Sequence, residues 1–182
     1  LGLPAALLPI HLLWINLVTD GLPALCLATD PIDPEVMKRK PRNRSEKITD
    51  RGFLGTMFLT GCLTAGVSFA VYFYMLKTAT PEIARTYAFT VLVFEELIRA
   101  FGARSETKSI WRISLLTNLN LLLVVGVSFG LQVWSHHSEA FGRFLKTSAM
   151  PLTDCLVLLA FGTIPLVVLE IVKLIRRARA PV

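Results

Sequence analysis

Paired cysteines and cysteine–histidine clusters are missing from this sequence of 182 residues. Its three cysteines, Cys26, Cys62 and Cys155, lie in separate apolar stretches, so it lacks the spacing of a disulfide framework or a structural zinc site. We interpret all three as small packing residues. The chain also opens without an initiator methionine, a charged n-region or a cleavage site. We therefore expect no signal peptide, and the sequence begins as if inside a longer protein.

Charged residues are scarce over long stretches, and no internal repeat or low-complexity tract is present. Hydrophobic residues make up 53% of the sequence, and the mean hydropathy is +0.58. The apolar residues come in blocks of roughly 20, the length that crosses about 30 Å of hydrocarbon. This pattern indicates a membrane protein. It argues against a basic nucleic-acid-binding protein, although the net charge is +6.

The apolar blocks predict an all-α, polytopic transmembrane helix bundle that forms one domain over residues 1–182. We expect five spans, at about residues 7–29, 52–76, 83–103, 113–134 and 152–175. The second span carries Thr56, Thr60, Thr64 and Ser68 at intervals of four residues. Such a stripe of small residues is suited to close helix packing in lipid, and we interpret it as structural.

Basic residues are distributed unevenly among the segments that connect these spans. Along the chain, the four connections and the C-terminal tail carry 7, 2, 3, 2 and 4 Lys and Arg residues. Because loops rich in Lys and Arg stay in the cytoplasm, we expect a cytoplasmic loop at residues 30–51 and a cytoplasmic C-terminus. We interpret the basic run KRKPRNR as a topology signal; the alternatives are binding to anionic lipid headgroups and, less plausibly, to nucleic acid.

Polar groups interrupt the first span at WINLVTDGLPA. Asn16 and Asp20 lie four residues apart, so they share a helix face, with Thr19 beside them. A charged Asp near the bilayer centre costs about 2.5–3.5 kcal/mol, which a bound cation would offset. Gly21 and Pro23 weaken the helix here, and carbonyls freed at membrane depth can line an ion site. The alternative is a polar contact between helices with a protonated Asp.

The third span contains a second group of charged residues, in VLVFEELIRAF. Glu95 and Glu96 are adjacent, so their side chains point in different directions. Arg99 lies within reach of either carboxylate. One of them can therefore bind an ion while the other pairs with Arg99. The alternative is that all three lie near the cytoplasmic end and extend towards water.

The histidines give weaker indications of function. His11 is a candidate proton-relay group, but its place near the outer end of the first span favours an interfacial position. His136 and His137 fall in an outer loop, and we expect both to be solvated.

The first span and its following loop, LLWINLVTDGLPALCLATDPIDPEVM, resemble the sixth transmembrane helix and loop of type-II P-type ATPases. The similarity is greatest to the calcium pumps of the sarcoplasmic-reticulum type. It continues through PAALLP before the span, VLVFEELIRAFGARSE in the third span, and Pro151, Pro165, Glu170 and Lys173 near the end. The five spans thus resemble helices six to ten of that family, whose C-terminus is cytoplasmic.

This resemblance implies a calcium site. By position, Asn16, Thr19 and Asp20 match the ligands of the sixth helix, and Asp20 matches the carboxylate shared between two calcium ions. Glu96 matches the carboxylate of the eighth helix. Calcium takes six to eight oxygens, and these four residues supply about five or six, so a complete site needs helices outside this sequence.

Other positions concern coupling and ion number. Asp33 and Glu35 match acidic residues of the loop that couples the membrane region to the phosphorylation domain, whereas Lys38 replaces an acid of that loop. Glu95 and Arg99 depart from the family pattern. An Arg99 guanidinium turned towards Glu96 would occupy the place of one calcium ion, which predicts one ion per cycle.

The family's DKTGT phosphorylation motif, its nucleotide-binding domain and its fourth and fifth helices do not occur in the sequence. The resemblance therefore implies about the last fifth of a pump, inactive without the remainder that uses ATP and magnesium. Expected partners are the lipid bilayer and that remainder, with proton counter-transport and no nucleic acid. Manganese is the nearest alternative ion. A stand-alone regulator or channel-like bundle is the alternative class of protein.

Overall fold

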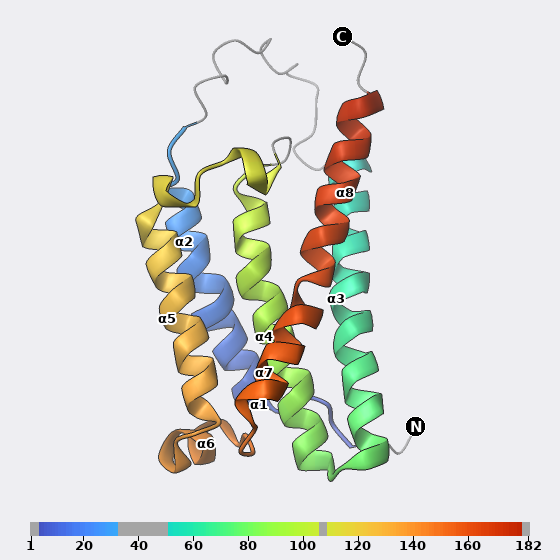
Figure 1. Ribbon diagram of the computed structural model, residues 1–182, viewed down its shortest axis with the longest axis vertical. Coiled ribbons are helices and arrows are strands. Elements are labelled where there is room, and N and C mark those ends of the chain that lie inside the picture. Colours follow the sequence, from blue (N-terminus) through green and yellow to red (C-terminus); the bar gives the residue numbers. More distant parts are fainter. Residues whose placement is uncertain (1–3, 33–50, 106–108, 180–182) are drawn as a thin grey trace.

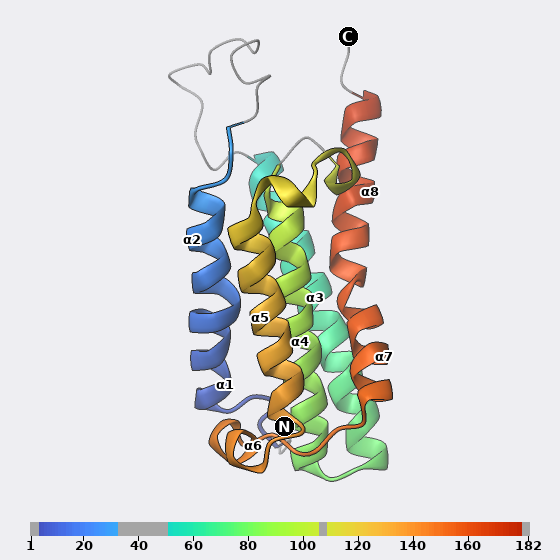
Figure 2. The same ribbon diagram turned by 60° about the vertical axis from the view of Figure 1, so that its left-hand side comes forward.

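The computed structural model describes residues 4–32, 51–105 and 109–179, and Figures 1 and 2 show them as a helical bundle. The prediction of an all-α membrane bundle is confirmed. The first span is continuous and has three parts. The helices in chain order are α1 (Pro9–Trp14), η1 (Ile15–Gly21), α2 (Leu22–Ala28), α3 (Arg51–Thr78), α4 (Pro81–Ala103), η3 (Ile110–Arg112), η4 (Leu115–Thr117), α5 (Leu119–Ser135), α6 (Glu139–Leu145), α7 (Leu152–Gly162) and α8 (Ile164–Arg179).

The helix boundaries follow local signals in the sequence. Thr80 caps α4 by accepting a hydrogen bond from the Ile83 nitrogen, and Pro81 stands in the first turn. Asn118 caps α5 by accepting one from the Leu121 nitrogen at 2.9 Å. This cap corrects the predicted start of the fourth span at residue 113, because α5 begins only after Asn118 and the short turn η4 precedes it.

Helix α4 lies in the middle of the bundle, and α3, α5, α7, α8 and η1 all contact it. Its apolar side chains are buried almost all round; Phe89, Val91, Phe94 and Leu97 are each 0% exposed. Phe94 stacks on Phe129 of α5 with 4.7 Å between ring centroids. Because other helices surround it, α4 provides a fixed support for the polar groups that it carries.

Among the described residues, three helical segments are long and apolar enough to cross a membrane: Pro9–Ala28, Gly52–Thr78 and Leu152–Arg176. A fourth is added if α5 and α6, which meet at a bend of 99°, count as one span. Helix α4 is long enough to cross a membrane, but it carries five charged side chains and is therefore not one of these candidates. The five-span topology and the sidedness of the loops therefore stay predictions.

Two histidines are buried, so the prediction of a solvated His136 was wrong. The interfacial position predicted for His11 concerns its depth in the membrane and stays a prediction. His11 is 0% exposed and stacks on Phe89 at 4.2 Å, and its Nε2 lies 2.8 Å from the Leu145 carbonyl oxygen. His136 is also buried, between the Thr90 hydroxyl and the Ser148 carbonyl. The His11 ring thus binds the last residue of α6, and the His136 ring joins the end of α5 to Thr90 of α4. His137 is exposed, as expected.

The two smaller packing predictions had different outcomes. Thr60 and Thr64 of α3 are buried and Ser68 reaches α4, which agrees with a packing role for the small-residue stripe. Of the cysteines, Cys155 is buried but Cys62 is exposed, so Cys62 does not pack within this chain.

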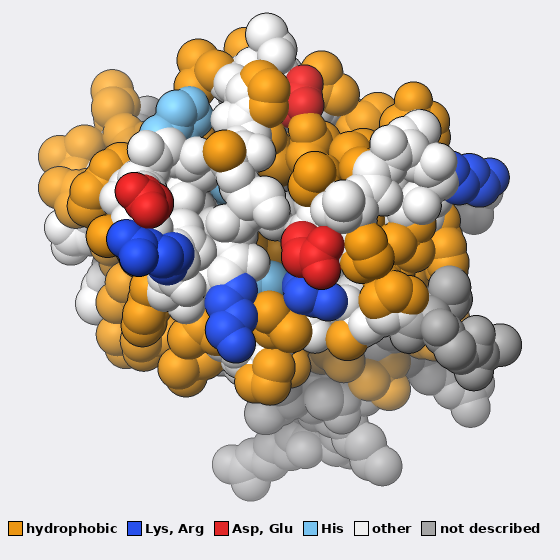
Figure 3. Space-filling view, turned by 90° about the horizontal axis from the view of Figure 1, so that it is seen from below, with side chains coloured by type: hydrophobic (Ala, Val, Ile, Leu, Met, Phe, Trp, Pro, Cys, Tyr) orange, Lys and Arg blue, Asp and Glu red, His pale blue; other side chains and the backbone are white. Residues whose placement is uncertain are grey.

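The end of the bundle at which α6 lies is seen in Figure 3, where acidic and basic side chains are scattered among uncharged ones. Hydrophobic side chains surround this polar end. The opposite end holds the last turn of α2, the turns η3 and η4, and the end of α8 (Figure 1).

Candidate cation site

The middle of the first span is a π-helix, Ile15–Gly21, which contains every polar residue predicted to form the site on that span. A π-turn has one more residue than an α-turn, and such turns are frequent at functional sites. A Cβ atom added to Gly21 would lie 2.9 Å from the Asn16 carbonyl oxygen, closer than real Cβ atoms come. A residue without a side chain is therefore required where the widened turn closes.

Pro23 follows the widened turn and has no hydrogen to give to a carbonyl four or five residues earlier. The helix nevertheless continues through Pro23 into α2, so the predicted disturbance of the ladder takes the form of a π-turn rather than an unwound segment. The Val18 carbonyl accepts a hydrogen bond from the Ser128 hydroxyl of α5 at 3.4 Å. A neighbouring helix thus contributes a polar contact at this level of the first span.

The three polar residues of the π-helix differ in burial. Thr19 is 2% exposed, and its hydroxyl donates to the Ile15 carbonyl at 2.8 Å. The oxygen of that hydroxyl keeps lone pairs for a further contact. Asn16 and Asp20 are exposed in this chain. Their oxygens are therefore accessible to groups that approach the first span from outside the bundle.

The adjacent glutamates of α4 face different partners, as predicted. Glu95 is 1% exposed, and its Oε2 accepts a hydrogen bond from Ser68 of α3 at 3.1 Å. Its Oε1 has no hydrogen-bond partner among the described residues. Glu96 forms an ion pair with Arg99, and its side chain is 11% exposed. Because Glu95 is buried against α3, the idea that all three charged groups extend towards water does not hold for it.

Glu96 also lies close enough to Asp20 for the two carboxyl groups to interact. One belongs to η1 and the other to α4, so the fold brings together two acids that are far apart in the sequence. Arg99 balances one of the two negative charges. In the described part of the chain, no group of three or more His, Cys, Asp and Glu residues is arranged to hold a metal ion.

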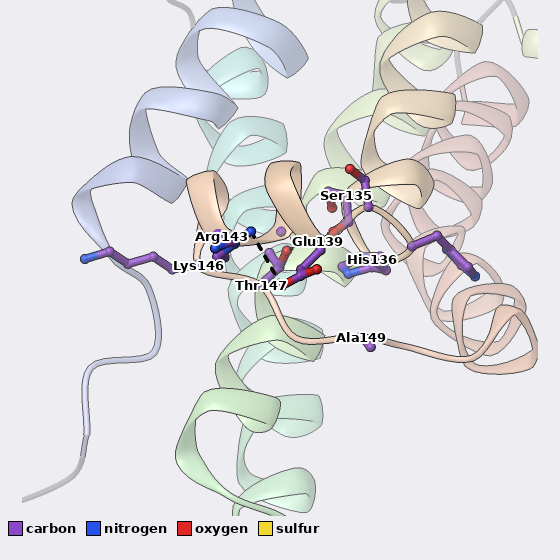
Figure 4. A pocket seen from close by; sticks show the side chains of 10 residues that line it. Ser135, His136, Glu139, Arg143, Lys146, Thr147 and Ala149 are labelled. Carbon is purple, nitrogen blue, oxygen red and sulfur yellow. Dashed lines mark hydrogen bonds and ion pairs between the residues drawn. The ribbon is translucent and has the colours of Figure 1, made fainter.

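Other predicted positions lie elsewhere. Asp33 and Glu35, expected in the coupling loop, and Lys38 fall outside the described residues. At the far end of the bundle, a pocket of about 470 Å³ is lined by His136, Glu139 and Arg143, among others (Figure 4). Glu139 and Arg143 form an exposed ion pair there at 3.5 Å. None of the predicted cation ligands lines this pocket.

The sequence is similar to calcium-transporting ATPases. Calcium-transporting ATPase 1 of Bacillus cereus is 37% identical over 97% of this chain and 22% of its own length. Calcium-transporting ATPase 1 of Saccharomyces cerevisiae is 34% identical over 97% of this chain and 19% of its own length. The human calcium-transporting ATPase type 2C member 1 is 28% identical over 98% of this chain and 20% of its own length.

The chain therefore spans about a fifth of the length of these curated relatives. The family model described as the C-terminus of cation-transporting ATPases matches residues 4–175, nearly the whole sequence. This chain belongs to the cation-transporting ATPase family, of which it represents the C-terminal membrane region.

Proposed function

We propose that this chain is the membrane part of an ATP-driven calcium pump and that Asp20 and Glu96 bind the transported ion. The nearness of these two carboxyl groups, on two helices that pack against each other, is the observation that carries the proposal. The names of the relatives support calcium as the ion. Carboxylate, amide and hydroxyl oxygens are the ligands that hard cations such as calcium prefer.

Asn16 and Thr19 complete the set of ligands from this chain. Asn16 offers its side-chain amide oxygen, and Thr19 its hydroxyl oxygen, which already donates its proton to Ile15. Because Asn16 and Asp20 are exposed, their oxygens remain open to ligands from the remainder of the pump. Those additional ligands are needed to reach the six to eight oxygens around calcium.

The energy for transport comes from outside this chain. ATP, magnesium and the phosphorylated aspartate belong to the remainder of the pump, so the chain alone hydrolyses nothing. The segment with Asp33 and Glu35 passes movements of the phosphorylation domain to the first span. As calcium leaves, Asp20 and Glu96 take up protons, which gives proton counter-transport.

The test is ATP-driven calcium uptake into vesicles by the full-length pump, in wild type and the Asp20→Asn and Glu96→Gln variants. Each variant keeps the shape of the side chain and removes its charge. We expect uptake to disappear and phosphorylation to lose its activation by calcium. Glu139→Gln is the matched control, because that side chain is 85% exposed at the far end of the bundle.

Uptake that survives Asp20→Asn at normal calcium affinity would overturn the proposed site. If the wild-type pump transports manganese but not calcium, the proposed ion is wrong and the proposed site still stands. If no cation activates phosphorylation of the wild-type protein, the proposal that it is a cation pump is wrong.

A further inference from the structure

An almost buried ion pair joins the end of the first span to the end of α4. Arg104 follows the last residue of α4 and donates two hydrogen bonds to the Asp30 carboxylate. Its Nη2 lies 2.9 Å from Oδ1, and its Nε lies 3.1 Å from Oδ2. The Arg104 side chain is 3% exposed and that of Asp30 is 16% exposed. Pairs that are shielded from water in this way are screened less by salt than surface pairs are.

The same two residues also hold the start of α5. Arg104 donates to the Ser114 carbonyl at 2.9 Å and to the Thr117 hydroxyl at 2.6 Å. The Asn118 amide donates to Asp30 at 2.8 Å and to the Cys26 carbonyl at 3.0 Å, while its oxygen caps α5. The guanidinium therefore joins the segment after α2 to the end of α4 and to η4, and Asn118, bound to the same Asp30, extends this network to the start of α5. We call Asp30, Arg104, Thr117 and Asn118 the clamp.

The clamp lies on the same two helices as the candidate cation site. With a rise of 1.5 Å per residue, Asp30 is about 15 Å along the first span from Asp20, and Arg104 is about 12 Å along α4 from Glu96. Asp30 also stands just before Asp33, the first acidic residue expected in the coupling loop. A movement transmitted along the chain from that loop to Asp20 therefore passes through Asp30.

We propose that Arg104 is a positioning residue that couples the first span to α4. Because the clamp fixes the end of the span, a pull on the segment beyond Asp30 moves the span as a whole instead of bending its last turn. This inference rests on the proposed function, since it concerns how that pump uses its site. Arg104 acts through Asp30 and Asn118 and does not touch the ion.

The geometry requires arginine. Its planar guanidinium presents several N–H donors in a fixed arrangement, which suits a carboxylate and two further acceptors at once. A lysine keeps the positive charge but offers one ammonium group on a flexible stem. Arg104→Lys therefore removes the rigid link while keeping the charge balance around Asp30.

The experiment uses the full-length pump and compares wild type, Arg104→Lys, Asp30→Asn and the double variant. Turnover of calcium-activated ATP hydrolysis is divided by the amount of enzyme that can be phosphorylated. We expect each single variant to lower this turnover about tenfold. The calcium concentration for half-maximal activation should stay within about twofold of wild type, because the ligands are untouched.

A purely structural role would change the yield of folded enzyme and leave turnover per folded molecule unchanged, which would overturn the proposal. The double variant should be no slower than either single variant, because both remove the same contact. Fully additive losses would also overturn it. Arg143→Lys is the matched control, since Arg143 belongs to an exposed pair with Glu139.

If Arg104→Lys does not accumulate, Thr117→Val decides the outcome. It removes one acceptor of the guanidinium at an exposed residue, and we expect a smaller loss of turnover at unchanged calcium activation. Normal turnover in both Thr117→Val and Asp30→Asn would reject the clamp while leaving the calcium pump in place. A wild-type enzyme without calcium-activated hydrolysis would reject both proposals.

Discussion

Arg99 donates a hydrogen bond to Glu96 from one turn further along α4, and the resulting ion pair lies beside Asp20. The Glu96 carboxylate, one of the two acids of the proposed site, is therefore already paired with a guanidinium. The two acids and one arginine leave a single net negative charge among these side chains.

We therefore expect one calcium ion per phosphorylated pump. Two closely spaced divalent cations would repel each other and the Arg99 guanidinium, with little negative charge to offset the repulsion. Equilibrium binding of radioactive calcium, divided by the number of phosphorylation sites, measures the ratio directly. A ratio of two in the wild type would show that Arg99 does not take the place of an ion.

Gly21→Ala tests the widened turn of the first span. The added methyl group must push against the Asn16 carbonyl, 2.9 Å from the ideal Cβ position. Overpacking of this kind costs about 1–3 kcal/mol. Because Asn16 and Asp20 move with the same backbone, we expect calcium affinity to fall by roughly tenfold. The measurement is the calcium dependence of phosphorylation in the full-length pump.

Gly126→Ala provides the comparison for this variant. Gly126 lies in α5, and among the described residues no heavy atom outside its own stretch of helix comes within 4 Å of its ideal Cβ. Alanine there should leave calcium affinity unchanged and strengthen the helix slightly. Equal effects of the two substitutions would contradict the special requirement for glycine at position 21.

His136 should make stability depend on pH. It lies in the turn after α5, where burial lowers its pKa from 6.5 to about 4. The folded protein thus favours the neutral ring, so its contribution to stability is complete above pH 6.5. This contribution is lost as the pH falls towards 4, by roughly 3 kcal/mol in total.

Thermal unfolding in detergent between pH 4 and 7 measures this loss. His136→Gln, which keeps hydrogen-bonding groups but does not titrate in this range, should flatten the profile. An unchanged slope in that variant would assign the pH dependence to other groups. His137→Gln is the control, because the neighbouring ring is exposed.

Much of the helical architecture could be predicted from sequence, because long apolar runs and local caps determine it. Pro81 after Thr80, for example, marks the start of α4. The burial of His11 and His136 could not be predicted, since their partners are the carbonyls of Leu145 and Ser148. A backbone carbonyl has no signature in the sequence, and tertiary packing alone brings it to the ring.

The candidate site was predictable to a similar degree. The residue types and spacing at Asn16 and Asp20 indicated an oxygen site, but they did not reveal the π-helix, because Gly21 and Pro23 disturb a ladder without specifying its new form. The pairing of Arg104 with Asp30 was missed altogether. In a sequence, both look like ordinary loop charges, and only the three-dimensional arrangement distinguishes them from solvated ones.

The break between α7 and α8 bears on Glu96 as well. A Cβ at Gly162, the last residue of α7, would lie 3.0 Å from Phe94 Cβ and 3.3 Å from the Glu95 nitrogen. The last span and α4 thus pack closely at the first of the two glutamates. A side chain at position 162 would require Phe94 or the α4 backbone to move by a few tenths of an ångström. The absence of a side chain at Gly162 therefore lets the last span lie directly against the turn of α4 that carries the candidate ligand Glu96.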